Sequence, residues 1–112
     1  MPKKAQIKIG SDEGEVQSSI CEYLVLKRIV FWRQNNFPPA DLKGGFYRKM
    51  PPYSVKGVSD IIAIKNGKAY FLEVKDQAKQ SKDQKTFEEM VTRGGAVYAV
   101  VRSIDDVIKL GL

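Results

Sequence analysis

An Asn-Gly dipeptide, Asn66-Gly67, separates two runs of apolar residues near the middle of the chain. This dipeptide is the one best suited to a two-residue type I′ turn, because both turn residues must take a positive φ. Such a turn fixes the register of a hairpin, so that facing residues have position numbers summing to 133, and Asp60 faces Glu73. The sequence therefore predicts a β-hairpin, with strands at about 58–65 and 68–75, that sets two carboxylates face to face.

Two facing carboxylates need a counterion. Directly opposed side chains of an antiparallel pair have Cβ atoms roughly 4.5–5.5 Å apart, where like charges repel. A divalent cation relieves the repulsion, because hard cations take oxygen ligands. Lys75 lies two residues after Glu73, and the alternation of a strand turns both side chains to the same face. We expect Asp60, Glu73 and Lys75 to converge.

Length and composition exclude several classes of protein. A chain of 112 residues is about one domain, and we expect residues 1–10 to be a flexible basic arm or short edge strand and residues 11–112 the single domain. The absence of histidine excludes His-dependent catalysis and His-ligated metals, and a single cysteine excludes multi-cysteine zinc sites. Because no apolar run reaches the roughly 20 residues of a membrane span, and no signal peptide is evident, we expect a cytoplasmic protein with no membrane partner.

The positive charge is concentrated in one segment. The net charge is +6, and residues 27–56 carry seven basic residues against a single acid, Asp41, leaving 12 basic and 12 acidic residues elsewhere. Basic charge interleaved with Phe46, Tyr47 and Tyr53 in a segment rich in Pro and Gly indicates a polyanion partner, with nucleic acid the first candidate. An ordinary basic surface loop is the alternative.

The remaining segments alternate between helical and extended patterns. A stripe formed by Val16, Ile20 and Leu24 predicts the first helix, and Phe87, Met90 and Val91 lie on the apolar side of a second. The expected elements are a helix at 11–28, a strand at 29–33, a long loop at 35–56, the hairpin, a helix at 81–93, a strand buried on both faces at 96–102 and a helix at 104–110. The helix after the hairpin has the length of a right-handed crossover. The fold class is α/β, with a central mixed sheet flanked by helices.

Asp60, followed by Glu73-x-Lys75 on the adjacent strand, resembles the PD-(D/E)xK nuclease superfamily and its restriction-endonuclease-like core. Flanking features are similar to one branch, the VRR-NUC (virus-type replication-repair nuclease) domain. These features are Gly57-Val58-Ser59-Asp60-Ile61-Ile62, Gly67-Lys68, Glu73-Val74-Lys75, Ser81-x-x-Gln84-x-x-Phe87, Gly94-Gly95 and the segment from Val100 to Val107. The resemblance covers about residues 11–110; the one departure is Ser59 at the position of the superfamily's proline, which is not a ligand.

The resemblance implies a role for each site residue. Asp60, Glu73 and the main-chain carbonyl of Val74 would bind Mg²⁺ or Mn²⁺, with no small-molecule cofactor, and Lys75 would orient water or stabilise the transition state. A glutamate of the first helix would reach the metal through water. We prefer Glu13, because Glu15 has a capping explanation with Asp12, although Glu15 and Gln17 stay open. Gln84 would hydrogen-bond near Lys75 or the metal site.

The resemblance also implies a function: a metal-dependent DNA endonuclease of bacterial or phage type, acting as a homodimer on branched DNA such as Holliday junctions. Candidate phosphate contacts are Arg33, Arg48, Lys49 and Lys56. Two alternatives remain, namely a non-catalytic nucleic-acid-binding module with the nuclease fold and a sequence-specific restriction-type nuclease. The second would need residues 35–56 to read a groove.

Overall fold

The computed structural model describes residues 13–34, 52–76 and 79–112. The elements are α1 (Glu13–Leu26), β1 (Val30–Arg33), β2 (Ile61–Lys65), β3 (Lys68–Val74), α2 (Lys82–Arg93), β4 (Val97–Val101) and α3 (Ile104–Lys109). They follow the predicted order of helix, three strands, helix, strand and helix. The predicted arm at residues 1–10 and most of the predicted loop lie outside the described residues.

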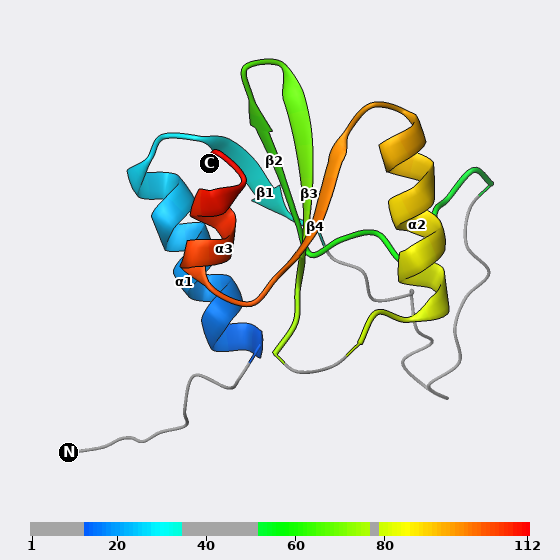
Figure 1. Ribbon diagram of the computed structural model, residues 1–112, viewed down its shortest axis with the longest axis horizontal. Helices are drawn as coiled ribbons and strands as arrows, with labels where there is room; N and C mark the ends of the chain where they lie inside the picture. The colour runs from blue at the N-terminus through cyan, green and yellow to red at the C-terminus, as the bar shows by residue number, and fades with distance from the viewer. Residues whose placement is uncertain (1–12, 35–51, 77–78) are drawn as a thin grey trace.

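The four strands form one mixed sheet in the order β1-β2-β3-β4. The pairs β1–β2 and β2–β3 are antiparallel, whereas β4 runs parallel to β3, as a crossover through α2 requires. Figure 1 shows α1 and α3 together on one side of the sheet and α2 on the other. The α/β architecture with a mixed, helix-flanked sheet is confirmed.

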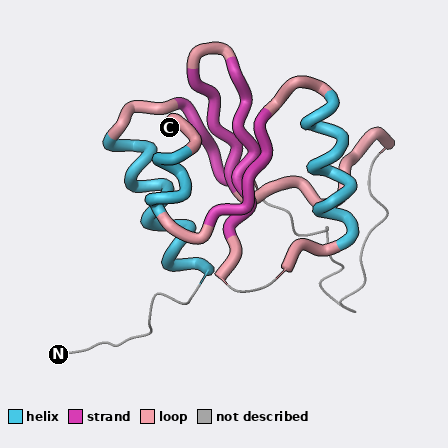
Figure 2. Tube along the Cα trace, in the orientation of Figure 1, coloured by secondary structure: helices cyan, strands magenta, loops and turns pink. Residues whose placement is uncertain are grey.

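The hairpin between β2 and β3 has the predicted register. Lys65 faces Lys68, and Ile62 faces Phe71. The turn residues Asn66 and Gly67 have φ angles of 53° and 76°, which are the positive values that a type I′ turn demands. Because β2 and β3 are the two central strands, the hairpin lies in the middle of the sheet (Figure 2).

The main core lies between the sheet and the α1–α3 pair. Ile20 and Leu24, one helical turn apart on α1, are fully buried, as the predicted stripe requires. Their buried partners come from β2, β3, β4, α3 and the chain end: Ile61, Ala63, Leu72, Val74, Val101, Val107 and Leu112. A smaller aromatic cluster on the other side packs Phe87 of α2 edge-on against Phe71 and Tyr98.

Two expectations about burial are wrong. The strand β4 is half-buried over most of its length rather than buried on both faces, because it is an edge strand that pairs only with β3. Met90 is exposed, because the face of α2 that meets the sheet is centred between Phe87 and Val91. In the described part of the chain no helix is long and apolar enough to cross a membrane.

Two leucines of α1 provide a matched test of this packing. Leu24 is fully buried, whereas Leu26 is exposed. We expect Leu24→Ala to lower the free energy of unfolding by about 2–5 kcal/mol, because it leaves a cavity in the main core. Leu26→Ala should change it by less than about 0.5 kcal/mol. Urea unfolding followed by circular dichroism measures both, and equal losses would contradict the orientation of α1.

Candidate functional site

Asp60 and Glu73 meet at one end of the central hairpin. Asp60 directly precedes β2, Glu73 is the next-to-last residue of β3, and the hairpin register continued by one pair sets them opposite each other. The Val74 N–H donates a hydrogen bond of 2.8 Å to Asp60 Oδ2, which fixes one oxygen of that carboxylate. The hairpin therefore delivers the facing acids that its turn predicts.

Glu73 is held through a single oxygen by one hydrogen bond and one ion pair. Its Oε2 accepts a 2.8 Å hydrogen bond from Gln84 Nε2 and lies 3.8 Å from the Lys75 Nζ. Its side chain is 3% exposed, and its Oε1 is buried without a hydrogen-bond partner. A buried carboxylate oxygen left without a partner is costly, so this atom marks a place where a ligand belongs.

Burial raises the pKa of both carboxyl groups. Burial, followed by the charge of Asp60, raises the pKa of Glu73 to about 8. Burial also raises the pKa of Asp60, partly opposed by the hydrogen bond from the Val74 N–H. The low dielectric around the pair strengthens the repulsion between the two charges. Either a proton or a cation relieves it.

Gln84 joins the site to the start of α2. Ser81 is the N-cap, its Oγ accepting from the Gln84 N–H at 3.2 Å while the Ser81 N–H donates to Gln84 Oε1 at 2.8 Å, which completes a capping box. Because Gln84 Oε1 accepts from the Ser81 N–H, the Nε2 of the same amide group is turned to the other side, where it donates to Glu73. The cap therefore sets the direction of the donor that holds Glu73.

Gly57 packs against the same helix start. Its φ is +75°, and a Cβ built there would lie 2.5 Å from the Asp83 carbonyl carbon and oxygen and 2.9 Å from the Gln84 nitrogen. Only glycine allows the segment before Asp60 to approach the α2 backbone this closely. Gly57 thereby sets the spacing between the segment that carries Asp60 and the helix that carries Gln84.

Glu13 is the acidic residue of α1 that reaches the site. Its Oε2 accepts from the Asp76 N–H at 3.3 Å, and its charge contributes to the raised pKa of Asp60 and of Glu73. Glu15 is exposed, and Gln17 accepts a hydrogen bond from Arg33. Of the three candidates that the sequence left open, the structure brings Glu13 to the acid pair.

The donor set fits a hard divalent cation. Among the described residues, Asp60 Oδ1 and Glu73 Oε1 are the oxygens of the facing acids that accept no hydrogen bond from a main-chain or amide donor. Carboxylate and main-chain oxygens are the ligands that Mg²⁺ and Mn²⁺ prefer. No group of three or more acidic or cysteine side chains gathers within metal-binding range in the described segments. The Val74 carbonyl and water are needed to complete such a site.

The candidate phosphate contacts are spread over the molecule. Arg33 lies on the α1 side of the sheet, and its Nε donates to Gln17 Oε1 at 2.6 Å. Lys56 is exposed in the segment before Gly57. Arg48 and Lys49 lie outside the described residues. The structure thus brings none of the four beside the acid pair within the residues it describes, and their contact with phosphate stays a prediction.

Three polar residues near the acid pair were not identified from the sequence. Burial raises the pKa of Tyr98 to about 12, with the charges of Glu73 and Asp60 adding to the effect. Gln80 Nε2 donates to Tyr98 Oη at 3.2 Å. The Gln34 N–H donates to the Asp60 carbonyl at 2.7 Å, which places Gln34 beside Asp60 in the sheet. The sequence did offer a signal for Gln34: it lies two residues after Trp32, so the alternation of an extended strand turns both side chains to the same face.

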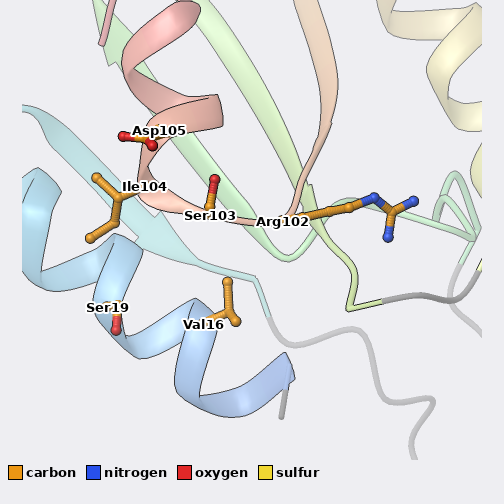
Figure 3. A pocket seen from close by; sticks show the side chains of 6 residues that line it. All are labelled: Val16, Ser19, Arg102, Ser103, Ile104 and Asp105. Atoms are coloured by element: carbon orange, nitrogen blue, oxygen red, sulfur yellow. The ribbon is translucent and has the colours of Figure 1, made fainter. Parts of the chain in front are cut away.

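A shallow hollow lies on the α1–α3 side, away from the acid pair. Its lining residues are Val16, Ser19, Arg102, Ser103, Ile104 and Asp105. Figure 3 shows the Arg102 side chain pointing away from the other lining residues, and its Nη1 donates to the Asp76 carbonyl at 2.7 Å. Since the Asp76 N–H binds Glu13, Arg102 helps to hold the segment that positions Glu13.

Comparisons with known proteins bear on the fold. No family model matches the chain, and no curated protein matches it. A solved structure described as a VRR_NUC domain is 24% identical, with a TM-score of 0.60 over 88% of this chain and 91% of that one. The likeness establishes the fold.

The raised pKa of Glu73 predicts how stability changes with pH. Between its ordinary value of 4.5 and about 8, the folded chain keeps a proton that the unfolded chain has released. Stability should therefore fall as pH rises through this range, by up to about 1.4 kcal/mol per pH unit. Urea unfolding in EDTA at several pH values measures the slope. Glu73→Gln should flatten it, and an unchanged slope in that variant would contradict the assignment.

Two glycines with the same backbone conformation test the contact between Gly57 and α2. Gly67 has φ +76° and open space around it, whereas Gly57 has φ +75° and the close approach to Asp83. Gly67→Ala should cost about 1–2 kcal/mol from the left-handed backbone alone. Gly57→Ala should cost more and shift the NMR signals of the Gln84 side-chain amide, which Gly67→Ala leaves in place. Equal costs with unchanged amide signals would show that the contact is unimportant.

Proposed function

We propose that this chain, which has the fold of a VRR-NUC domain, is a metal-dependent nuclease that hydrolyses phosphodiester bonds in DNA. The single observation that carries the proposal is the buried, unpartnered Oε1 of Glu73 facing Asp60, with the Lys75 ammonium group beside the same carboxylate. A pair of acids that needs a cation, next to a lysine, suits the hydrolysis of a phosphate ester.

Asp60, Glu73 and the main-chain carbonyl of Val74 would hold Mg²⁺ or Mn²⁺. Such an ion stabilises the charge that develops on phosphate and makes water a stronger nucleophile. The chain's contribution is to hold the two carboxyl groups in place. The Val74 N–H holds Asp60, and the Gln84 amide holds Glu73, so neither acid needs to reorganise when the substrate arrives.

Lys75 is the cationic group of the proposed mechanism. Its ammonium lies 3.8 Å from Glu73 Oε2, and its side chain is 12% exposed. From this position it can orient the attacking water and stabilise negative charge on the phosphate oxygens, in a setting with little water to weaken the interaction. Glu13 would act indirectly, because its carboxylate can accept a hydrogen bond from a water at the same site.

We propose branched DNA, such as a Holliday junction, as the substrate and a homodimer as the acting species. A single small domain has little surface for reading base sequence, whereas the basic excess of residues 27–56 suits a sugar-phosphate backbone of any sequence. Two copies of the site acting on paired strands would explain cleavage at a branch point. Such an enzyme acts in the cytoplasm of a bacterial or phage-infected cell.

The proposed activity is tested with purified protein and Mg²⁺ or Mn²⁺ on four-way junctions, flaps and linear strands. We expect cleavage that EDTA abolishes. Glu73→Gln and Lys75→Ala should each lower kcat by about 10²–10³-fold, because each removes a group that acts on the transition state. Lys68→Ala makes the same charge change on β3 at an exposed site and should retain activity.

Three outcomes would contradict the proposal. The first is a folded wild-type protein that binds DNA and leaves every substrate intact with either metal, as expected of a non-catalytic binding module. The second is undiminished cleavage by Lys75→Ala. The third is cleavage confined to one base sequence in linear duplexes, which would indicate a restriction-type enzyme.

A further inference from the structure

Helix α2 covers only half of its side of the sheet. Its Phe87 packs on Phe71 of β3 and Tyr98 of β4. The backbone of α2 does not come close to β1 or β2, and of the apolar side chains that these two strands turn to this side, Ile62 is buried. On these two strands three apolar side chains that point to the α2 side are exposed: Val30 by 62%, Trp32 by 45% and Ile64 by 39%. We call these three residues the open strip.

The pairing of β1 with β2 fixes the direction of the open strip. Trp32 pairs with Ile62, and Val30 pairs with Ile64. Phe31, which lies between Val30 and Trp32 in the sequence, packs instead against the main core on the α1 side. Since side chains alternate along a strand, Val30 and Trp32 face the other side, together with the acid pair.

The open strip leads directly to Asp60. Trp32 pairs with Ile62, so Asp60, just before β2, is the diagonal neighbour of Trp32, and such neighbours lie about 7–8 Å apart. The Gln34 N–H donates to the Asp60 carbonyl, which extends the same ladder by one pair. Trp32, Gln34 and Asp60 therefore lie side by side on one face of the sheet.

Trp32 and Gln34 orient each other. The Trp32 Nε1–H donates to Gln34 Oε1 at 3.2 Å, which satisfies the polar atom of the indole. Because Gln34 Oε1 is the acceptor, the two hydrogens of Gln34 Nε2 remain to be donated, and no described residue accepts them. An exposed aromatic ring beside a free amide donor can stack on a base and donate to a sugar-phosphate oxygen.

We propose that the open strip binds an unpaired nucleotide of the DNA strand whose phosphodiester lies at Asp60 and Glu73. The base stacks on Trp32, and Gln34 donates to the backbone. The inference rests on the proposed nuclease function and names how the substrate is held. A base within a duplex has both faces covered by its neighbours, so stacking on Trp32 requires an unpaired base, as at a branch point or in a single strand.

Charge favours DNA over a second copy of the chain as the occupant. Strand β1 follows Lys27 and Arg28 and ends at Arg33, and no acidic residue lies between positions 27 and 34. These positive charges attract a polyanion to the strand that bears Trp32, and they repel an identical strand of another copy. In the described part of the chain no strand pairs with the outer edge of β1, and this edge together with the open strip would otherwise suit a dimer contact, so the experiment separates the two occupants.

Trp32 is the only tryptophan of the chain, so its fluorescence reports on the open strip alone. The probe is a single-stranded oligodeoxynucleotide of about 12 nucleotides, titrated into the protein in EDTA. We expect saturable quenching that does not depend on protein concentration. A strand of the same length whose bases are replaced by abasic sites should bind more weakly and leave the emission nearly unchanged.

Variants separate stacking from packing, with anisotropy of a labelled strand as the measure of affinity. Trp32→Leu keeps an apolar side chain without a π face and should weaken binding on the order of 10-fold or more, while Trp32→Phe should keep most of the affinity. Gln34→Leu should cost about 5-fold. Leu26→Ala, which removes an exposed apolar group of α1, should change nothing. In cleavage assays Trp32→Leu should raise KM with little change in kcat.

Several results would overturn the inference. They are no quenching by the oligonucleotide, equal quenching by the abasic strand, and emission that follows protein concentration and ignores DNA, which would make the strip an interface between copies. The titration in EDTA needs no hydrolysis, so the two proposals fail separately. Cleavage without quenching would refute only the role of the open strip, and quenching without cleavage would refute only the nuclease activity.

Discussion

The opposition of a buried and a half-buried carboxylate at one end of a central hairpin is the constraint on which the rest of the site depends. Each acid is fixed through one oxygen, Asp60 by the Val74 N–H and Glu73 by the Gln84 amide. The fixed bonds prevent the carboxylates from turning apart to reduce their repulsion. The repulsion between the two charges therefore remains until a proton or a cation reduces it, and burial increases the repulsion by excluding the water that would otherwise screen it.

The residues that position the two acids also stabilise the start of α2. Gln84 completes the N-cap of α2 with one end of its amide and holds Glu73 with the other. Gly57 lets the segment before Asp60 touch the same helix start. A change in the position of α2 would move both acids' supports together, so the site and the helix cap form one unit rather than two independent features.

Local chemistry explains which parts of the structure could be predicted from the sequence. The turn at Asn66-Gly67 joins β2 and β3 through two residues, so its dihedral preferences alone fix the register that sets Asp60 against Glu73. The pairing of β1 with β2 has no such short connection, because 27 residues, 34–60, separate the two strands. The place of Gln34 beside Asp60, and the turning of Arg33 to the α1 side, depend on that distant pairing.

The helices cover the two sides of the sheet unequally, and this determines from which side a polymer could reach Asp60 and Glu73. On the α1–α3 side the sheet is closed by the main core, which fills the space behind Leu72 and Val74. On the other side α2 closes the half formed by β3 and β4, since Phe87 packs against both strands. On the half formed by β1 and β2, Ile62 is buried, whereas the side chains of the open strip remain exposed in the structure of the described residues. In the proposed function, a phosphodiester at Asp60 and Glu73 belongs to a chain that must continue on both sides of the cut, and the open strip would offer that chain a path. The exposed indole of Trp32 would lie on this path, which would explain why an apolar side chain on an edge strand remains uncovered.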